Sequence, residues 1–499
     1  MGAWFAGSFE RCLELCDAVR HRDPATRTNI ALLRARALLR LDRADAALQT
    51  LRDAAAIPVG TDEWITTRML TGAAHVRRGE AGDIDEGLAI LLSANADAGA
   101  VHPTIRSELA LNVGLAHYSR RDFDAADRAL SAVARDADIV YARAMHARAR
   151  IAMARGKNDR ATTLFSLALQ QLDECRHHDA YFEANTTRIL AHLALDRLDR
   201  EAWSVVADRR TRIDASADGL AEPLFWVAYC ACAFHLDVEG DVLGAAREAR
   251  LAEALAPTDA CRVLARCRRA VVARRAGEPN AHRDHVESAY ELFSTLRVDE
   301  LSVDEKLAPA VLADELANID VSRASAMLAV HGALAPPQPI YMSQSPSNEA
   351  FRALMEATVA EHRGDTPVAL ERYRRAFELY ARIRNLRRSA MAASRIAHLS
   401  GDRKMREYAD KTTAHLSAQS WMRAEVASLT SRGAKLTDVQ REVLALICKG
   451  KSNPEIARLR KRSLHTVRNL VARLFEIFEV KSREELAVEC VRRGLVGRG

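Results

Sequence analysis

A short motif that recurs through the first 380 or so residues constrains the fold more than any other feature of the chain. Each copy has a turn marked by Gly or Asp, a few mostly polar residues, and then small or apolar residues that begin a helix. Seven copies start at Gly7, Asp42, Gly82, Arg121, Gly156, Gly240 and Gly364. The first five lie 35, 40, 39 and 35 residues apart. Periods of this length are typical of stacked helix pairs, so the sequence predicts an all-α solenoid.

Small and aromatic residues recur at fixed helical spacing inside three of these copies. The segments are Ala161-x3-Phe165-x2-Ala168, Ala245-x3-Ala249-x2-Ala252 and Ala369-x3-Tyr373-x2-Ala376. Alanine lets a neighbouring helix approach, and the aromatic ring fills the space beside it. With their turns, these copies resemble the tetratricopeptide repeat. That resemblance implies a groove that binds an unknown protein, peptide or small-molecule ligand, although a spacer or oligomerisation scaffold is the alternative.

Breaks in the repeat pattern suggest the domain organisation. The stretch 335–348 is rich in Pro and Ser and contains Ala335-Pro-Pro-Gln-Pro, which predicts a break or hinge. We therefore expect a tetratricopeptide-like array over 1–334, further helical repeats over 349–425, a linker over 426–435 and a separate C-terminal domain over 436–499. The shorter stretch Asp214–Gly219 predicts one long turn between helices.

The positive charge of the chain is concentrated at its C-terminal end. The whole chain has 73 Lys and Arg against 67 Asp and Glu, a net charge of +6. Residues 435–499 alone hold 15 basic and 8 acidic residues, so the remainder is nearly neutral. A small basic domain on a neutral array indicates a polyanion, such as double-stranded DNA, as the partner of this end.

Start and stop signals divide this basic segment into four short helices. Capping residues at Thr437, Ser452, Ser463 and Ser482 begin them, and Gly450 ends the first. Apolar residues of the third predicted helix fall on one side at 100° per residue. They are Val467, Leu470, Val471, Leu474 and Phe478. The opposite side is polar and basic, which suits a helix that enters the major groove.

Eleven residues form the candidate DNA-binding set. Those of the helix ends and the turn supply cations for backbone phosphates, and those of the third helix supply groups for base edges. The first group is Lys449, Lys451, Arg460, Lys461 and Arg462. The second group is His465, Thr466, Arg468, Asn469, Ala472 and Arg473.

Motifs spread over the same segment resemble the LuxR-type helix-turn-helix. They are Leu436-Thr, Arg441-Glu-Val-Leu444, Gly450-x-Ser-Asn453, Glu455-Ile-Ala457, Ser463-x-x-Thr-Val-Arg468 and Val480-x-x-Arg483. The resemblance implies a four-helix domain whose third helix reads DNA through Arg468, Asn469 and Ala472, and whose fourth helix makes a homodimer on DNA. Arg460 and Arg462 stand where the family usually has apolar residues, which bears on the packing of the turn. A retained domain that no longer binds DNA is the alternative.

Other function classes find no support in the residues. No GxxxxGK[ST] phosphate loop occurs, and the nine cysteines lack metal-ligand spacing, so we expect neither an enzyme nor a cofactor or metal site. No apolar stretch is long enough for a membrane span, and the predicted location is the cytoplasm. The sequence therefore predicts a cytoplasmic transcriptional regulator. The alternative is a protein-interaction scaffold whose terminal domain serves dimerisation or titration.

Overall fold

The computed structural model describes residues 2–19, 23–56, 60–213, 218–302, 304–334, 346–431, 438–478 and 480–486. Within these ranges every regular element is a helix, so the all-α prediction is confirmed. The chain divides into two compact units, Met1–Ser389 and Ala390–Gly499, and each is described by itself. No helix of these ranges is both long and apolar enough to span a bilayer.

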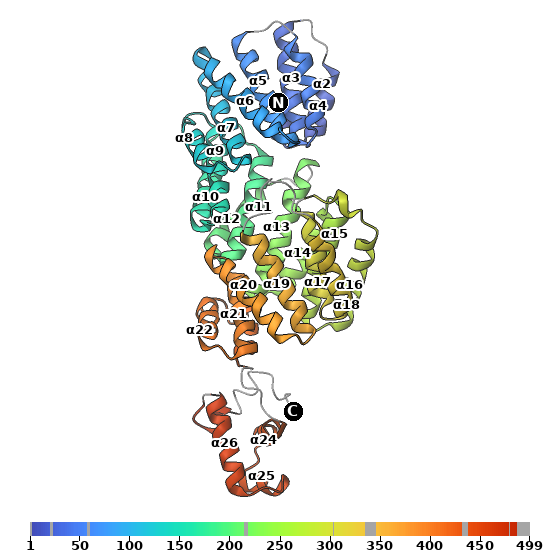
Figure 1. Ribbon diagram of the computed structural model, residues 1–499, viewed down its shortest axis with the longest axis vertical. Helices are drawn as coiled ribbons and strands as arrows, with labels where there is room; N and C mark the ends of the chain where they lie inside the picture. Colours follow the sequence, from blue (N-terminus) through green and yellow to red (C-terminus); the bar gives the residue numbers. More distant parts are fainter. Residues whose placement is uncertain are drawn as a thin grey trace. The chain divides into compact units, whose positions relative to one another are not determined.

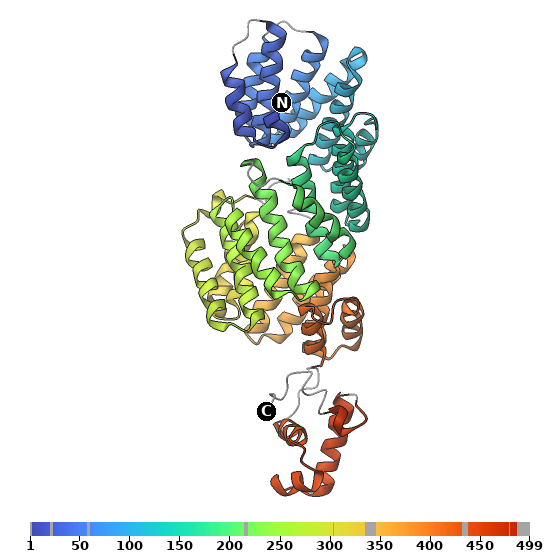
Figure 2. The same ribbon diagram turned by 180° about the vertical axis from the view of Figure 1, so that it is seen from behind.

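The first unit is a stack of helix pairs, which Figures 1 and 2 show from opposite sides. The array opens with α1 (Gly2–Phe5) and α2 (Phe9–Ala18). The pairs are α3 (Pro24–Arg40) with α4 (Ala44–Ala55), α5 (Thr61–Arg78) with α6 (Asp83–Asp97), α7 (Pro103–Ser119) with α8 (Phe123–Ser131), α9 (Ile139–Ala154) with α10 (Asn158–Asp173), α11 (Ala180–Arg197) with α12 (Arg200–Arg212), α13 (Ala221–Phe234) with α14 (Val242–Leu255), α15 (Asp259–Ala276) with α16 (Pro279–Ser294), α17 (Ala308–Leu316) with α18 (Val321–Ala333), and α19 (Pro346–His362) with α20 (Thr366–Arg382).

Short helical turns lie between some of these helices. They are η1 (Ala98–Ala100), η2 (Asp218–Leu220), the π-helical turn η3 (His235–Glu239), η4 (Val298–Glu300) and η5 (Glu305–Leu307). The predicted turn at Asp214–Gly219 joins α12 to α13 through η2, and residues 214–217 lie outside the described residues.

The recurring motif marks real turns between helices. All seven motif positions have a positive φ, from 60° at Asp42 to 88° at Gly82. Five of the seven are glycines, which adopt this left-handed conformation without steric cost, while Asp42 and Arg121 adopt it at some cost. The motif is therefore a conformational signal that reverses the chain between paired helices.

Small residues bring the helices of a pair close together. The residues of the three spaced segments, such as Ala161 and Phe165, are at most 1% exposed. Gly72 of α5 faces Gly87 of α6, where an added Cβ would lie 2.5 Å from the Gly72 carbonyl oxygen. Packing at this distance excludes any larger side chain. Trp64 lies outside this core: it is 45% exposed, and the Arg68 guanidinium lies over its ring, with Cζ 4.7 Å from the ring centroid.

The array continues past the predicted break at 335–348. Residues 335–345 lie outside the described residues, α19 begins at Pro346, and α19 packs on α17 and α18. The chain after α20 then returns to the middle of the same unit. Arg384 pairs with Asp159 at 3.1 Å, and Arg387 donates to Asp237 at 2.6 Å. This return places side chains that are far apart in sequence next to each other.

The second unit begins within α21 (Leu386–Ser400) and continues through α22 (Arg403–Thr413) and α23 (Trp421–Ser431). The predicted linker over 426–435 is thus helical as far as Ser431, and 432–437 lie outside the described residues. The unit ends in a small group of helices, which carries the candidate site.

Candidate nucleic-acid interface

Three short helices enclose one small core near the C-terminal end. They are α24 (Asp438–Cys448), α25 (Asn453–Leu459) and α26 (Leu464–Phe478), and α25 lies across one end of α26 in Figure 1. The core consists of Val443, Leu444, Ile447, Ile456, Ala457, Val467, Val471, Leu474, Phe478 and Leu486. The apolar side predicted for the third helix is the side that packs inward, with Leu470 half-buried at its margin. The opposite side of α26 is therefore turned to solvent.

Side-chain caps fix where α25 and α26 begin. Glu455 accepts hydrogen bonds from the Ser452 backbone N–H at 2.8 Å and from the Ser452 hydroxyl at 2.7 Å. These hydrogen bonds lower the pKa of Glu455 to about 2, so its carboxylate stays charged. Ser463 accepts from the Thr466 N–H at 3.0 Å and begins α26. Both predicted caps are confirmed, whereas Thr437, predicted to cap α24, lies outside the described residues.

The turn between α25 and α26 contains the run of cations. Lys461 adopts a positive φ of 47°, which reverses the chain. Arg460 points back to α24 and forms an ion pair with Glu442. Lys461 and Arg462 are exposed, and neither has an ion pair among the described residues. Arg460 therefore ties the turn to α24, and its neighbours carry the free positive charge.

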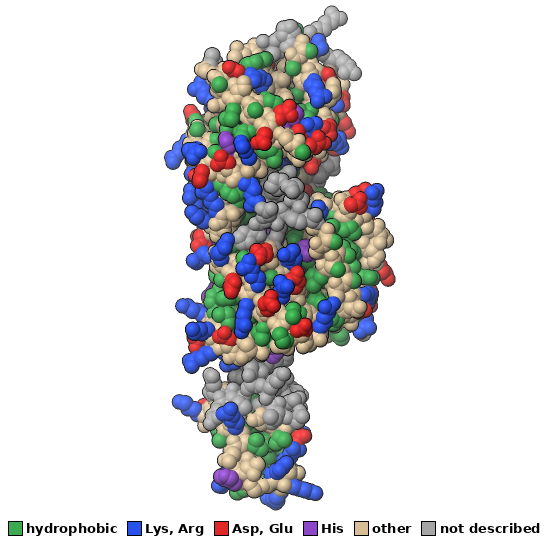
Figure 3. Space-filling view, in the orientation of Figure 1, with side chains coloured by type: hydrophobic (Ala, Val, Ile, Leu, Met, Phe, Trp, Pro, Cys, Tyr) green, Lys and Arg blue, Asp and Glu red, His purple; other side chains and the backbone are tan. Residues whose placement is uncertain are grey.

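The outer side of α26 is exposed over two turns. Its exposed residues are His465, Thr466, Arg468, Asn469, Ala472 and Arg473. Asn469 and His465 lie one turn apart and contact through their side-chain nitrogens at 3.3 Å. Arg468 has no ion pair or hydrogen bond among the described residues, so its guanidinium is available to a ligand. Figure 3 shows Lys and Arg side chains on the surface of this part of the protein.

Lysines of the first loop flank the same domain. Lys449 is exposed at the end of α24, next to Gly450, whose φ is +74°. Lys451 is half-buried, and its Nζ lies 3.6 Å from Glu455 Oε1. With Lys461 and Arg462, these lysines give the domain an excess of cations that are not fully paired internally.

Arg483 has a structural role that the sequence reasoning missed. It lies in the first turn of the fourth helix, which Ser482 caps through the Glu485 N–H at 3.0 Å. Its guanidinium donates to Asn453 Oδ1 at 2.8 Å and to the Lys451 carbonyl. Arg483 thus joins the fourth helix to the loop before α25. The remainder of the predicted fourth helix, from 487 on, lies outside the described residues.

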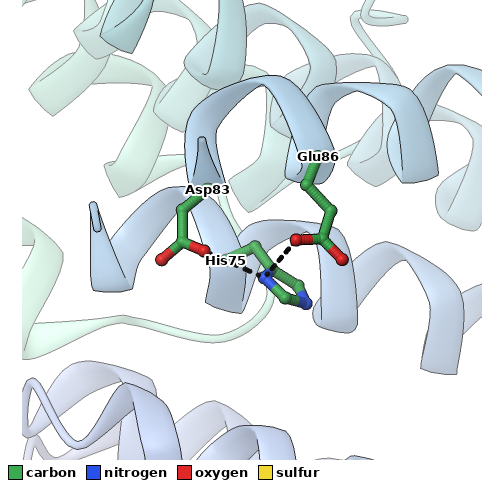
Figure 4. A group of neighbouring side chains, drawn as sticks. All are labelled: His75, Asp83 and Glu86. Atoms are coloured by element: carbon green, nitrogen blue, oxygen red, sulfur yellow. Dashed lines mark hydrogen bonds and ion pairs between the residues drawn. The ribbon is translucent and has the colours of Figure 1, made fainter. Parts of the chain in front are cut away.

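One group of side chains in the first unit could suggest a metal site, and Figure 4 shows it. His75 Nδ1 lies 3.4 Å from Asp83 Oδ1 and 3.6 Å from Glu86 Oε2. Arg78, however, donates to both Asp83 oxygens at 2.7 Å, and this pairing lowers the pKa of Asp83. The carboxylate that would bind the ion is already satisfied by a guanidinium, so the group serves to join α5 to α6.

A comparison with known protein families finds a match that coincides with the small C-terminal domain. Residues 434–490 match the family described as "Bacterial regulatory proteins, luxR family". No curated protein is significantly similar to the chain. Among solved structures, the chain is similar to the Rap protein complexed with Competence and Sporulation Factor, with 12% identity, a TM-score of 0.38 and coverage of 77% of this chain and 99% of that one. It is also similar to the APC/C hetero-tetramer Cut9-Hcn1, with 12% identity, a TM-score of 0.32 and coverage of 92% and 89%.

Proposed function

We propose that this chain, whose C-terminal part is a LuxR-type helix-turn-helix domain, is a transcriptional regulator that binds promoter DNA. The observation that carries the proposal is the exposed side of α26. A helix that packs its apolar side inward and presents Arg468 and Asn469 outward has the size and the donor groups for a major groove.

Each side chain on that helix suits a different contact. Arg468 can donate two hydrogen bonds to guanine, and Asn469 can pair with adenine once it gives up its contact with His465. Ala472 offers a methyl group that fits against the methyl group of thymine. Discrimination between base pairs therefore comes from these three positions, with His465, Thr466 and Arg473 beside them.

The surrounding cations set affinity and orientation rather than sequence preference. Lys449, Lys451, Lys461 and Arg462 lie outside the core at the loop and the turn, where they can neutralise phosphates on either side of the groove. Arg460 contributes differently, because its ion pair with Glu442 holds the turn against α24. It positions the neighbouring cations.

The helical array is the part that receives the signal, as a protein, a peptide or a small molecule. Homodimerisation through the fourth helix would place two copies of α26 on adjacent turns of the duplex. The proposed location is the cytoplasm, where the chain has access to DNA. The matched family is regulatory rather than enzymatic, and the chemistry assigned to this chain is binding alone.

A scaffold that acts through protein contacts is the competing function, and transcript profiles separate the two. The cells compared carry the wild-type gene, a gene deletion, or an Arg468→Ala/Asn469→Ala double variant. If the chain is a regulator, the double variant should give the same transcript profile as the gene deletion. If the chain is a scaffold, the double variant should give the wild-type transcript profile. Arg250→Ala, at an exposed arginine of α14, is the control that keeps the wild-type profile.

A further inference from the structure

The return of the chain after α20 brings four arginines into one region of the first unit. Arg188 lies on α11, Arg268 on α15, and Arg387 and Arg388 in the first turn of α21. All four act on the pKa of one or both of two groups on neighbouring helices, the half-buried imidazole of His192 and the buried thiol of Cys230, whose Sγ lies 3.4 Å from His192 Nδ1. Groups separated by up to 200 positions in sequence therefore share one electrostatic environment.

Two of these arginines are neutralised by carboxylates. Arg188 Nη1 lies 2.8 Å from Asp304 Oδ2. Arg387 donates from Nε to Asp237 Oδ2 at 2.6 Å, and both side chains are about 10% exposed or less. The Arg387–Asp237 pair is typical of a folded interior, where a charge is stable only beside an opposite charge.

Arg268 has no such partner. Its guanidinium lies over the ring of Tyr229, with Cζ 4.0 Å from the ring centroid. Its Nε is buried and makes no hydrogen bond, and no carboxylate of the described ranges lies within ion-pair distance of it. Stacking on a tyrosine recovers only part of the cost of removing a guanidinium from water.

Arg388 likewise lies against an aromatic ring and forms no ion pair with the described residues. It donates to the Tyr380 hydroxyl at 3.1 Å, and its Cζ lies 4.7 Å from the ring centroid of Phe351. No carboxylate in the described part of the chain forms an ion pair with it, although Asp196 acts on it from a greater distance. Burial raises the pKa of Asp196, which makes this carboxylate a poorer counter-charge than one in solvent.

Aromatic rings contact both arginines, while Asp237 acts on Arg268 and Asp196 on Arg388 from beyond ion-pair distance. Tyr229 and Trp226 pack edge to face at 5.5 Å. Burial and the neighbouring arginines lower the pKa of His192 to about 4, so its imidazole is neutral at physiological pH. The region thus keeps two arginines that form no ion pair with any described residue and that lie against aromatic rings.

We propose that Arg268 and Arg388 bind carboxylate groups of the ligand that the array recognises. Each guanidinium lies over an aromatic ring, and its N–H groups can donate two hydrogen bonds to a planar carboxylate. The rings of Tyr229 and Phe351 then contact the apolar part of the same ligand. This inference rests on the proposed role of the array as the receiving part, and it is independent of the DNA-binding residues.

Calorimetric titration of the full chain tests the proposal with three probes. They are N-acetyl-tetraglutamate peptide, the small dicarboxylate glutarate, and N-acetyl-tetraglutamine as the uncharged match. We expect saturable binding of at least one carboxylate probe and none of the uncharged peptide. Preference for the peptide identifies a peptide ligand, and preference for glutarate identifies a small organic acid. Failure of both carboxylate probes to bind overturns the proposal.

Two variants and a control tie that binding to the site. Arg268→Gln and Arg388→Gln each weaken it by about tenfold or more, because each removes a charge-assisted pair. Arg250→Gln, at an exposed arginine of α14, leaves it unchanged. Without ligand, Arg268→Gln unfolds at the same temperature as wild type or higher, since it removes a half-buried charge that forms no ion pair with the described residues. Binding equal to wild type, or a clear loss of stability without ligand, contradicts the assignment. We expect both variants to bind promoter DNA as wild type does, so that a failure of this ligand site can be distinguished from a failure of the proposed DNA-binding function.

Discussion

Replacing Arg468 by alanine removes the side chain that the account makes most responsible for sequence preference. The residue is exposed on α26 and has no ion pair or hydrogen bond among the described residues. Its loss therefore changes the free energy of unfolding of the domain by no more than about 0.5 kcal/mol. A bidentate arginine–guanine contact contributes about 1–3 kcal/mol of discrimination, which corresponds to roughly 5- to 150-fold in affinity.

Fluorescence anisotropy of the full chain on a labelled promoter duplex measures this change over a range of salt concentrations. Arg468→Ala weakens binding to the specific duplex much more than binding to a scrambled duplex. Arg462→Ala, which removes a proposed phosphate contact, weakens both equally and lowers the slope of log affinity against log salt by about 1. Equal loss on both duplexes for Arg468→Ala would refute base reading by this residue. Unchanged affinity on both would refute any contact.

Three further changes test the fold around these sites. Gly87→Ala destabilises the α5–α6 pair by about 1–3 kcal/mol, because its Cβ would overlap the Gly72 carbonyl. Gly332→Ala in α18 has open space around its Cβ and stabilises the protein by about 0.5–1 kcal/mol. Hydrogen exchange in the α5–α6 and α17–α18 pairs measures both changes. Arg483→Ala costs the C-terminal domain about 1–3 kcal/mol through its lost hydrogen bonds, seen as faster exchange in α25. Burial alone would raise the pKa of Glu315, but Arg274 and His282 hold this pKa at about 2. The stability that the carboxylate contributes is therefore present above its ordinary pKa and is lost as the pH falls from about 5 to about 2. We expect the acid unfolding of Glu315→Gln to depend less on pH over that window.

The local signals of the sequence predict the elements of both parts. The Gly and Asp turns mark positive φ at all seven motif positions, and alanine spacing marks the buried side of helices such as α10. Turns without such a residue were missed, for example at Leu198 and Arg384, which also have positive φ. Neither Leu198 nor Arg384 is of a residue type that favours the left-handed conformation, so composition does not mark these two turns.

Long-range pairing accounts for what the sequence did not predict. In the C-terminal domain, the exposure of Arg468 follows from helical periodicity. The contacts of Arg460 with Glu442 and of Arg483 with Asn453 depend on how the helices of this domain pack, which periodicity does not specify. The pairing of Arg387 with Asp237 is of the same kind, because it joins residues 150 positions apart in the sequence.

Crosslinking the chain to DNA in living cells and sequencing the recovered fragments tests the central claim most directly. We expect recovery of a limited set of promoter regions that share a two-fold symmetric motif, and loss of these regions when Arg468→Ala/Asn469→Ala replaces the wild-type chain. Fragments spread evenly over the genome, or an identical set recovered with the double variant, would contradict it.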